Sequence, residues 1–120
     1  MSGELRGRAV LVTGGGTGIG RACAEKLVAD GAAVTICGRT ASRLEDAAGK
    51  IEAAAAHGGR VQTVVADVTV EEQVRAAVAR ALVPTGSLDG CVANAGGGGA
   101  IAPYHLQNAQ ELHIVSTDFR

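Results

Sequence analysis

Aromatic side chains are almost absent from this chain. It has no tryptophan, and Tyr104 and Phe119 are its single tyrosine and its single phenylalanine. Its formal net charge is -1, from 11 basic and 12 acidic side chains. Proteins that bind nucleic acid need positive charge for the phosphates, and those that hold single strands also stack bases on aromatic rings. We therefore expect no nucleic-acid partner.

Long apolar segments and cysteine pairs are also missing. No apolar run is long enough to span a bilayer, and residues 1–8 are polar and lead straight into a predicted strand, so neither a membrane segment nor a signal peptide is expected. Cys23, Cys37 and Cys91 stand singly within apolar stretches, which is typical of buried thiols in a reducing compartment. No histidine has ligand spacing to another histidine or to a cysteine, so we expect no metal site. These features favour a cytoplasmic protein.

Short apolar runs alternate with segments of helical periodicity along the 120 residues, of which 47% are hydrophobic. The runs are nearly continuous, as in parallel strands that are buried on both faces. They cover residues 8–13, 33–37, 61–66 and 88–93. Helices are predicted between them. The first begins near Ile19, the second can be capped by Thr40 or Ser42, and the third should begin with a capping box, T-x-x-E, formed by Thr69 and Glu72.

This order predicts a Rossmann-like α/β fold with a doubly wound parallel sheet. Right-handed crossovers give the strand order 3-2-1-4 with helices on both faces, in a single domain over residues 1–120. Residues 96–99, all glycine, and Pro103 are expected in a loop, and residues 107–115 have weak helical periodicity. The outer edge of the fourth strand would then be unpaired, and such an edge invites self-association.

A glycine cluster, TGGGTGIG over residues 13–20, directly follows the first strand and opens the first helix. At that position the backbone N–H groups and the positive end of a helix can hold a phosphate. Gly15 and Gly20 have the spacing of a Walker A loop, but Arg21 and Ala22 follow in place of the lysine and the hydroxyl residue. The loop therefore favours the pyrophosphate of a dinucleotide.

In this loop the chain resembles the short-chain dehydrogenase/reductase family, specifically its N-terminal part. Two further motifs carry the resemblance. Asp67-Val68 ends the third strand, and Asn94-Ala95-Gly96 ends the fourth, with Ala93 in place of the first Asn of the family's NNAG motif. All three motifs follow strands, at the edge where such sheets bind ligands. The resemblance implies an oxidoreductase that binds a nicotinamide dinucleotide and acts on an alcohol/carbonyl pair.

The end of the second strand predicts which nicotinamide cofactor is bound. Enzymes that use NAD(H) place an acidic residue there for the ribose 2′-hydroxyl, whereas this chain has Gly38 followed by Arg39 and Thr40. A guanidinium can fork onto a 2′-phosphate, and a hydroxyl can add a donor. We therefore expect NADP(H) in preference to NAD(H). The predicted cofactor-binding residues are Gly14, Thr17, Gly18, Ile19, Gly20, Arg39, Thr40, Asp67, Val68, Asn94, Ala95 and Gly96.

The family's catalytic pair is not found among these residues. The resemblance implies a Tyr-x-x-x-Lys, but Tyr104 is followed four residues later by Asn108, and the only lysines are Lys26 and Lys50. No catalytic residue is therefore predicted, and the chain reads as the truncated, cofactor-binding half of the family fold. The alternative is a non-catalytic NADP-binding module. A methyltransferase of similar topology is disfavoured, because Gly38 stands where a ribose-binding acid would be needed.

Overall fold

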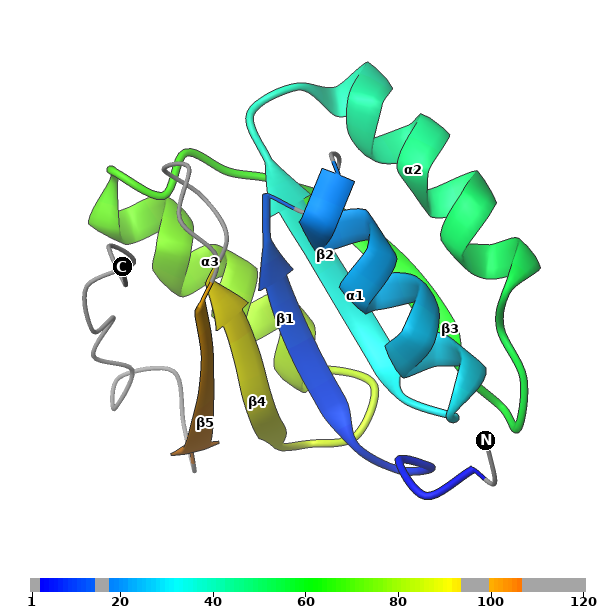
Figure 1. The fold of residues 1–120 in the computed structure, drawn as a ribbon. Helices are drawn as coiled ribbons and strands as arrows, with labels where there is room; N and C mark the ends of the chain where they lie inside the picture. The colour runs from blue at the N-terminus through cyan, green and yellow to red at the C-terminus, as the bar shows by residue number, and fades with distance from the viewer. Residues whose placement is uncertain (1–2, 15–17, 94–99, 107–120) are drawn as a thin grey trace.

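The computed structural model describes residues 3–14, 18–93 and 100–106, with side chains described for residues 3–14 and 18–92. The described helices and strands alternate up to β4, and β5 is the next described element (Figure 1). They are β1 (Ala9–Thr13), α1 (Gly18–Ala29), β2 (Ala33–Gly38), α2 (Ala41–Ala53), β3 (Arg60–Val65), α3 (Glu71–Leu82), β4 (Leu88–Ala93) and β5 (Ala100–Leu106).

The strands form one sheet in the order β3-β2-β1-β4-β5. The first four strands are parallel and lie in the order 3-2-1-4, so both the predicted direction and the predicted order are confirmed. The register aligns their carboxyl ends, because Thr13 pairs with both Cys37 and Ala93, and Gly38 pairs with Val65. The carboxyl ends of these four strands, which are far apart in the sequence, therefore lie along the same side of the sheet; this side is called the carboxyl edge below.

Helices cover both faces of the sheet, as predicted. In Figure 1, α1 and α2 lie in front of it and α3 lies behind. The side chains of β1 alternate between two cores, with Leu11 packed in the α3 core and Val12 in the α1/α2 core. Both are at most 1% exposed. Because the central strands are buried on both faces, their sequences are mostly apolar.

The predicted start of α3 is wrong in its detail. The N-cap position is Val70, and no side chain forms a cap hydrogen bond there. Thr69 instead donates its hydroxyl and its backbone N–H to the Asp67 carboxylate. A charged acceptor two residues earlier outcompetes the capping box, since Asp readily forms this local turn. Thr40 is the N-cap of α2, also without a side-chain cap bond.

The loop predicted around Pro103 is wrong as well, because Pro103 lies within β5. This strand is antiparallel to β4, and Pro103 is paired with Gly90. A proline is tolerated at the edge of a sheet, where its missing N–H can face away from the ladder. The outer edge of β4 is therefore paired, and β4 does not offer the open edge that was predicted to drive self-association. Residues 96–99 and 107–115 lie outside the described part of the chain.

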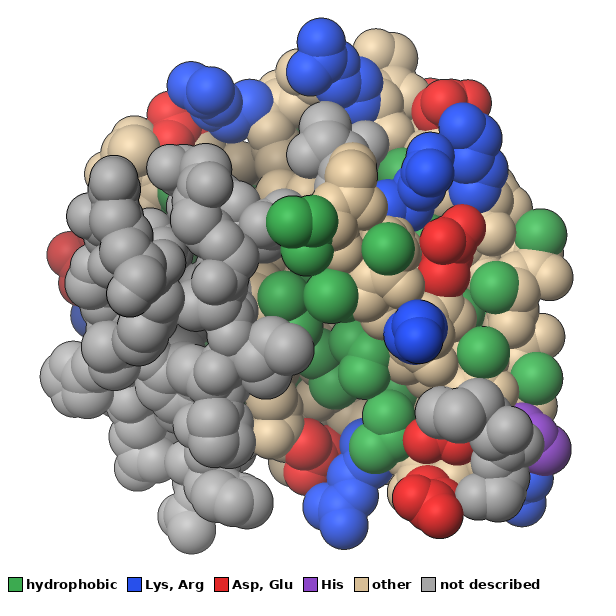
Figure 2. All heavy atoms as spheres, in the orientation of Figure 1, with side chains coloured by type: hydrophobic (Ala, Val, Ile, Leu, Met, Phe, Trp, Pro, Cys, Tyr) green, Lys and Arg blue, Asp and Glu red, His purple; other side chains and the backbone are tan. Residues whose placement is uncertain are grey.

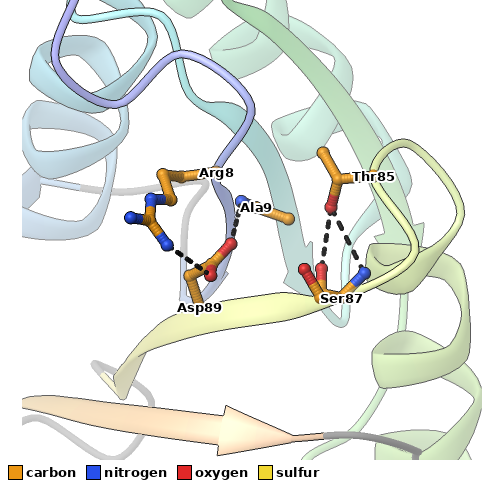
Figure 3. Close-up of polar contacts among 5 residues, drawn as sticks. All are labelled: Arg8, Ala9, Thr85, Ser87 and Asp89. Carbon is orange, nitrogen blue, oxygen red and sulfur yellow. Dashed lines mark hydrogen bonds and ion pairs between the residues drawn. The ribbon is translucent and has the colours of Figure 1, made fainter.

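The amino ends of β1 and β4 are joined by one carboxylate. Asp89 Oδ2 accepts the backbone N–H of Ala9 at 2.9 Å, and Oδ1 pairs with Arg8 Nη1 at 3.2 Å (Figure 3). The turn just before β4 is closed by Thr85, whose hydroxyl donates to the carbonyl of Ser87 at 2.8 Å (Figure 3). These contacts lie at the opposite edge of the sheet from the glycine loop.

Candidate functional site

Two described glycines, Gly14 and Gly18, flank the connection between β1 and α1 at the carboxyl ends of the strands. Gly14 has φ +68°, and its N–H donates to the carbonyl of Cys37 at 2.9 Å. Gly18, the first residue of α1, has φ +35°, and a Cβ placed on it would meet no atom of the described residues within 4 Å. Thr17 lies outside the described residues. Gly18 therefore leaves space directly at a helix N-terminus, which a phosphate group would fill.

The first turn of α1 carries no acidic side chain that would oppose an anion. Ile19 is 65% exposed although it is apolar, while Gly20 is buried against the core. The structure adds Arg21, which the sequence analysis did not select. Its Nε is buried and has no hydrogen-bond partner among the residues that the structure describes. A cation one turn into the helix adds to the positive potential at this end.

The end of β2 places a second cation at the same edge. Arg39 and Thr40 are exposed, and among the described residues no hydrogen bond or ion pair engages the Arg39 guanidinium. The carbonyl of Gly38 accepts the N–H of Ala66 at 2.8 Å. A Cβ on Gly38 would meet only Leu44, at an ordinary 3.5 Å, so space does not require glycine there. Figure 2 shows Lys and Arg side chains along the upper rim of this face, where β1 and β2 end.

The end of β3 holds a carboxylate in a fixed turn. Asp67 Oδ1 accepts the backbone N–H of Thr69 at 2.9 Å and its hydroxyl at 2.6 Å. These two bonds lower the pKa of the Asp67 carboxyl below its ordinary value, and the positive charge of Arg39 adds a smaller effect in the same direction. Val68 follows and is partly buried against the α3 core. Asp67 is thus an ionised acceptor that shares an electrostatic environment with Arg39.

The predicted site residues therefore meet in part. Gly14, Gly18, Ile19, Gly20, Arg39, Thr40, Asp67 and Val68 all lie at the carboxyl edge of the parallel strands. Asn94, Ala95, Gly96 and Thr17 lie outside the described residues. Sequence reasoning also missed Gln73, whose Oε1 accepts the Asp67 N–H at 2.7 Å. A glutamine on the next helix gives no sequence signal of such a contact.

Other chemistries find no support in the described part of the chain. Its residues include no group of three His, Cys, Asp or Glu side chains that could hold a metal ion. No helix among them is long and apolar enough to cross a membrane. Burial raises the pKa of the Cys37 thiol to about 12 and that of Cys91 to about 11, so neither is a ready nucleophile.

Comparisons of the sequence and of the structure with known proteins point to the same family. Residues 8–118 match the model of the short chain dehydrogenase family. The chain is 44% identical over 92 residues to a 2,5-dichloro-2,5-cyclohexadiene-1,4-diol dehydrogenase of Sphingobium indicum. This match covers 77% of the chain and 34% of the relative, so the chain spans about a third of the length of that relative.

Solved structures agree in fold and sequence. A short-chain type dehydrogenase/reductase from Mycobacterium ulcerans superposes with a TM-score of 0.71 at 40% identity, over 77% of this chain and 33% of that one. An NAD⁺-bound xylitol dehydrogenase superposes with a TM-score of 0.71 at 33% identity, over 81% of this chain and 36% of that one. At these identities the likeness extends beyond the fold alone.

Proposed function

The chain belongs to the short-chain dehydrogenase family, and on that premise we propose that the carboxyl edge of β1, β2 and β3 binds a nicotinamide dinucleotide. The protein is proposed to be an oxidoreductase acting on an alcohol/carbonyl pair. When bound, the nicotinamide supplies hydride transfer. The observation that carries the proposal is the open, positive-φ Gly18 at the N-terminus of α1.

The residues at this edge divide among the parts of the cofactor. The pyrophosphate is proposed to lie at the start of α1, held by backbone N–H groups of the glycine loop, with Gly14 shaping the turn. The exposed Ile19 side chain would shield the dinucleotide from water. Thr17 and the Asn94-Ala95-Gly96 segment are proposed to complete this pocket, as the family resemblance implies.

The adenine half is proposed to lie between the ends of β2 and β3. Asp67 offers an ionised carboxylate for the adenine amino group, and Val68 offers apolar contact. Arg39 is proposed to bind the ribose 2′-phosphate, with Thr40 as a hydroxyl donor, so that NADP(H) is preferred over NAD(H). What supports this is that Arg39 has no ion pair within the described part of the chain, while Gly38 brings no competing carboxylate.

The test compares the affinity of the chain for NADPH and NADH. We expect tighter binding of NADPH, and Arg39→Gln should weaken NADPH by about tenfold or more while leaving NADH nearly unchanged. Arg43→Gln is the matched control, because Arg43 is equally an exposed cation, on the first turn of α2, without an ion pair among the described residues. Equal losses in both variants would mean that general positive charge, rather than Arg39, sets the preference.

A converse variant tests the same site by gain. Gly38→Asp places a carboxylate where NAD(H) enzymes have one, and the added Cβ has room beside Leu44. We expect it to repel the 2′-phosphate and so to invert the preference toward NADH. Tighter NADPH binding by Gly38→Asp would contradict the proposed position of the ribose.

The second candidate is cofactor binding without turnover. It is favoured by one sequence observation: the 120 residues contain no Tyr-x-x-x-Lys. Binding and turnover are separated by measuring both on the same sample, since the chain should quench or enhance NADPH fluorescence without oxidising NADPH in the presence of a carbonyl compound. Steady NADPH oxidation by these residues alone would reject the binding-only function.

A further inference from the structure

Asp67 is held by contacts on both its backbone and its side chain. Its N–H donates to Gln73 Oε1 at 2.7 Å, and its carboxylate Oδ1 accepts two bonds from Thr69. Oδ2 has no hydrogen bond within the described part of the chain. The residue thus presents one committed oxygen and one oxygen that can accept a bond from a ligand.

The contact from Gln73 replaces a missing sheet hydrogen bond. The N–H of Ala66 donates to Gly38 at 2.8 Å, which is the last bond from this strand end to β2. The N–H of the next residue, Asp67, donates to Gln73 Oε1 instead of to β2, and β3 is the outermost strand on that side of the sheet. No strand can accept it there, so the Gln73 amide oxygen does so in place of a neighbouring strand.

Gln73 is itself fixed by a well-anchored helix. The following residue, Val74, is 7% exposed, and Ala77 is 1% exposed, both in the core between α3 and the sheet. The first turn of α3 is therefore held against the sheet, and the hydrogen bond from Asp67 to Gln73 fixes the Asp67 backbone relative to this turn. The chain of contacts runs from the α3 core through Gln73 to the backbone of Asp67.

We propose that Gln73 is a positioning residue for recognition of the adenine amino group by Asp67. The inference rests on the proposed binding of a nicotinamide dinucleotide at this edge. Without the Gln73 acceptor, the Asp67 backbone would turn to find another partner. Oδ2 would then no longer be aimed at one place, and the site would lose its preference for an amino group over an oxo group.

The test uses NADPH and its hypoxanthine analogue, in which an oxo group replaces the amino group of adenine. The wild-type chain should bind NADPH about tenfold more tightly than the analogue, because the analogue offers Asp67 an acceptor instead of a donor. Gln73→Met keeps the side-chain length and removes the acceptor, and it should reduce this preference to about twofold or less. A mere loss of stability would leave the ratio unchanged, since both nucleotides bind the same folded fraction.

Two further variants make the result specific. Gln73→Glu keeps an acceptor oxygen and should retain the wild-type preference. Glu72→Met is the matched control, because Glu72 is an exposed neighbour in the first turn of α3 with no hydrogen bond or ion pair among the described residues, and it should retain the preference. Wild-type preference in Gln73→Met would overturn the inference alone. Failure of the folded wild-type chain to bind NADPH would instead overturn the proposed function, and the inference with it.

Discussion

The hydroxyl of Thr69 lies 2.6 Å from Oδ1 of Asp67, and the Thr69 backbone N–H donates to the same oxygen at 2.9 Å. Both bonds favour the ionised carboxylate, and they are the main reason why the pKa of Asp67 is lowered. The hydroxyl that was predicted to cap α3 therefore serves the carboxylate at the end of β3. Loop geometry and charge at the candidate site depend on the same two residues.

Replacing Thr69 by Val should raise the pKa of Asp67 toward its ordinary value, because the hydroxyl donor is lost while the backbone donor remains. The wild-type carboxylate stabilises the fold above its ordinary pKa, and this contribution disappears as pH falls through the lowered pKa of the folded state. In Thr69→Val the loss should therefore be smaller and should be complete at a higher pH, because only the pKa of the folded state changes. Titration of the Asp67 carboxyl carbon by NMR measures this directly. Thr85→Val is the control, since the Thr85 hydroxyl bonds to a carbonyl instead of a carboxylate.

Two substitutions at Asp89 should have unequal costs. Asp89→Ala removes the acceptor for the N–H of Ala9, a residue that is 0% exposed, and should lower the free energy of unfolding by about 1–3 kcal/mol. Asp89→Asn keeps an oxygen for that N–H and loses only the ion pair with the exposed Arg8, so it should cost about 0–1 kcal/mol. Urea denaturation of both variants measures the difference. Equal losses would mean that the ion pair, and not the backbone bond, is what stabilises this end of the sheet.

Two glycines should respond in opposite ways to alanine. A Cβ on Gly59, which directly precedes β3, would clash with the carbonyl oxygen of Val28 in α1. Gly59→Ala must therefore move these two backbone segments apart and should destabilise the fold. Gly49 lies inside α2, and a Cβ there would meet nothing within 4 Å. Gly49→Ala should stabilise the fold by about 0.5–1 kcal/mol, because alanine favours helix. Thermal unfolding followed by circular dichroism would reveal shifts of opposite sign, and a stabilised Gly59→Ala would show that α1 and β3 are not packed this closely.

The buried thiols should make the fold less stable at alkaline pH. Burial raises the pKa of Cys37 to about 12, while in the unfolded chain this thiol ionises near its ordinary value. Between these two values the unfolded chain binds fewer protons, so the free energy of unfolding falls as pH rises. We expect a smaller fall between about pH 8 and pH 10.5 in Cys37→Ala than in the wild type, as measured by urea denaturation at each pH. An identical fall would assign the alkaline sensitivity to other groups.

The sheet could be predicted because its signals are local and repeated. The apolar runs containing Leu11, Ile36 and Val92 are nearly continuous, and parallel strands buried on both faces favour such runs. Right-handed crossovers then left few strand orders to consider. Pro103 misled the prediction because a proline ends a central strand but is tolerated in an edge strand, and the sequence does not state which strand is outermost.

The site could be predicted in position but not in its internal contacts. Gly18, Arg39 and Asp67 follow three strands, and parallel topology brings strand ends to one edge whatever their separation in sequence. The roles of Thr69 and Gln73 depend instead on which of several nearby polar groups forms a hydrogen bond with Asp67. Small differences in distance decide between these groups, and the sequence pattern does not predict such differences.

Because β1 lies in the middle of the sheet, its two neighbouring strands are synthesised at different times. β1 pairs with β2 on one side, and on the other it pairs with β4, whose Val92 lies opposite Val12. A ribosome that has released the first three strands presents a nascent sheet in which β1 is an open edge, with its amide groups waiting for a strand not yet translated. Until residue 93 emerges, another nascent chain could pair with this edge.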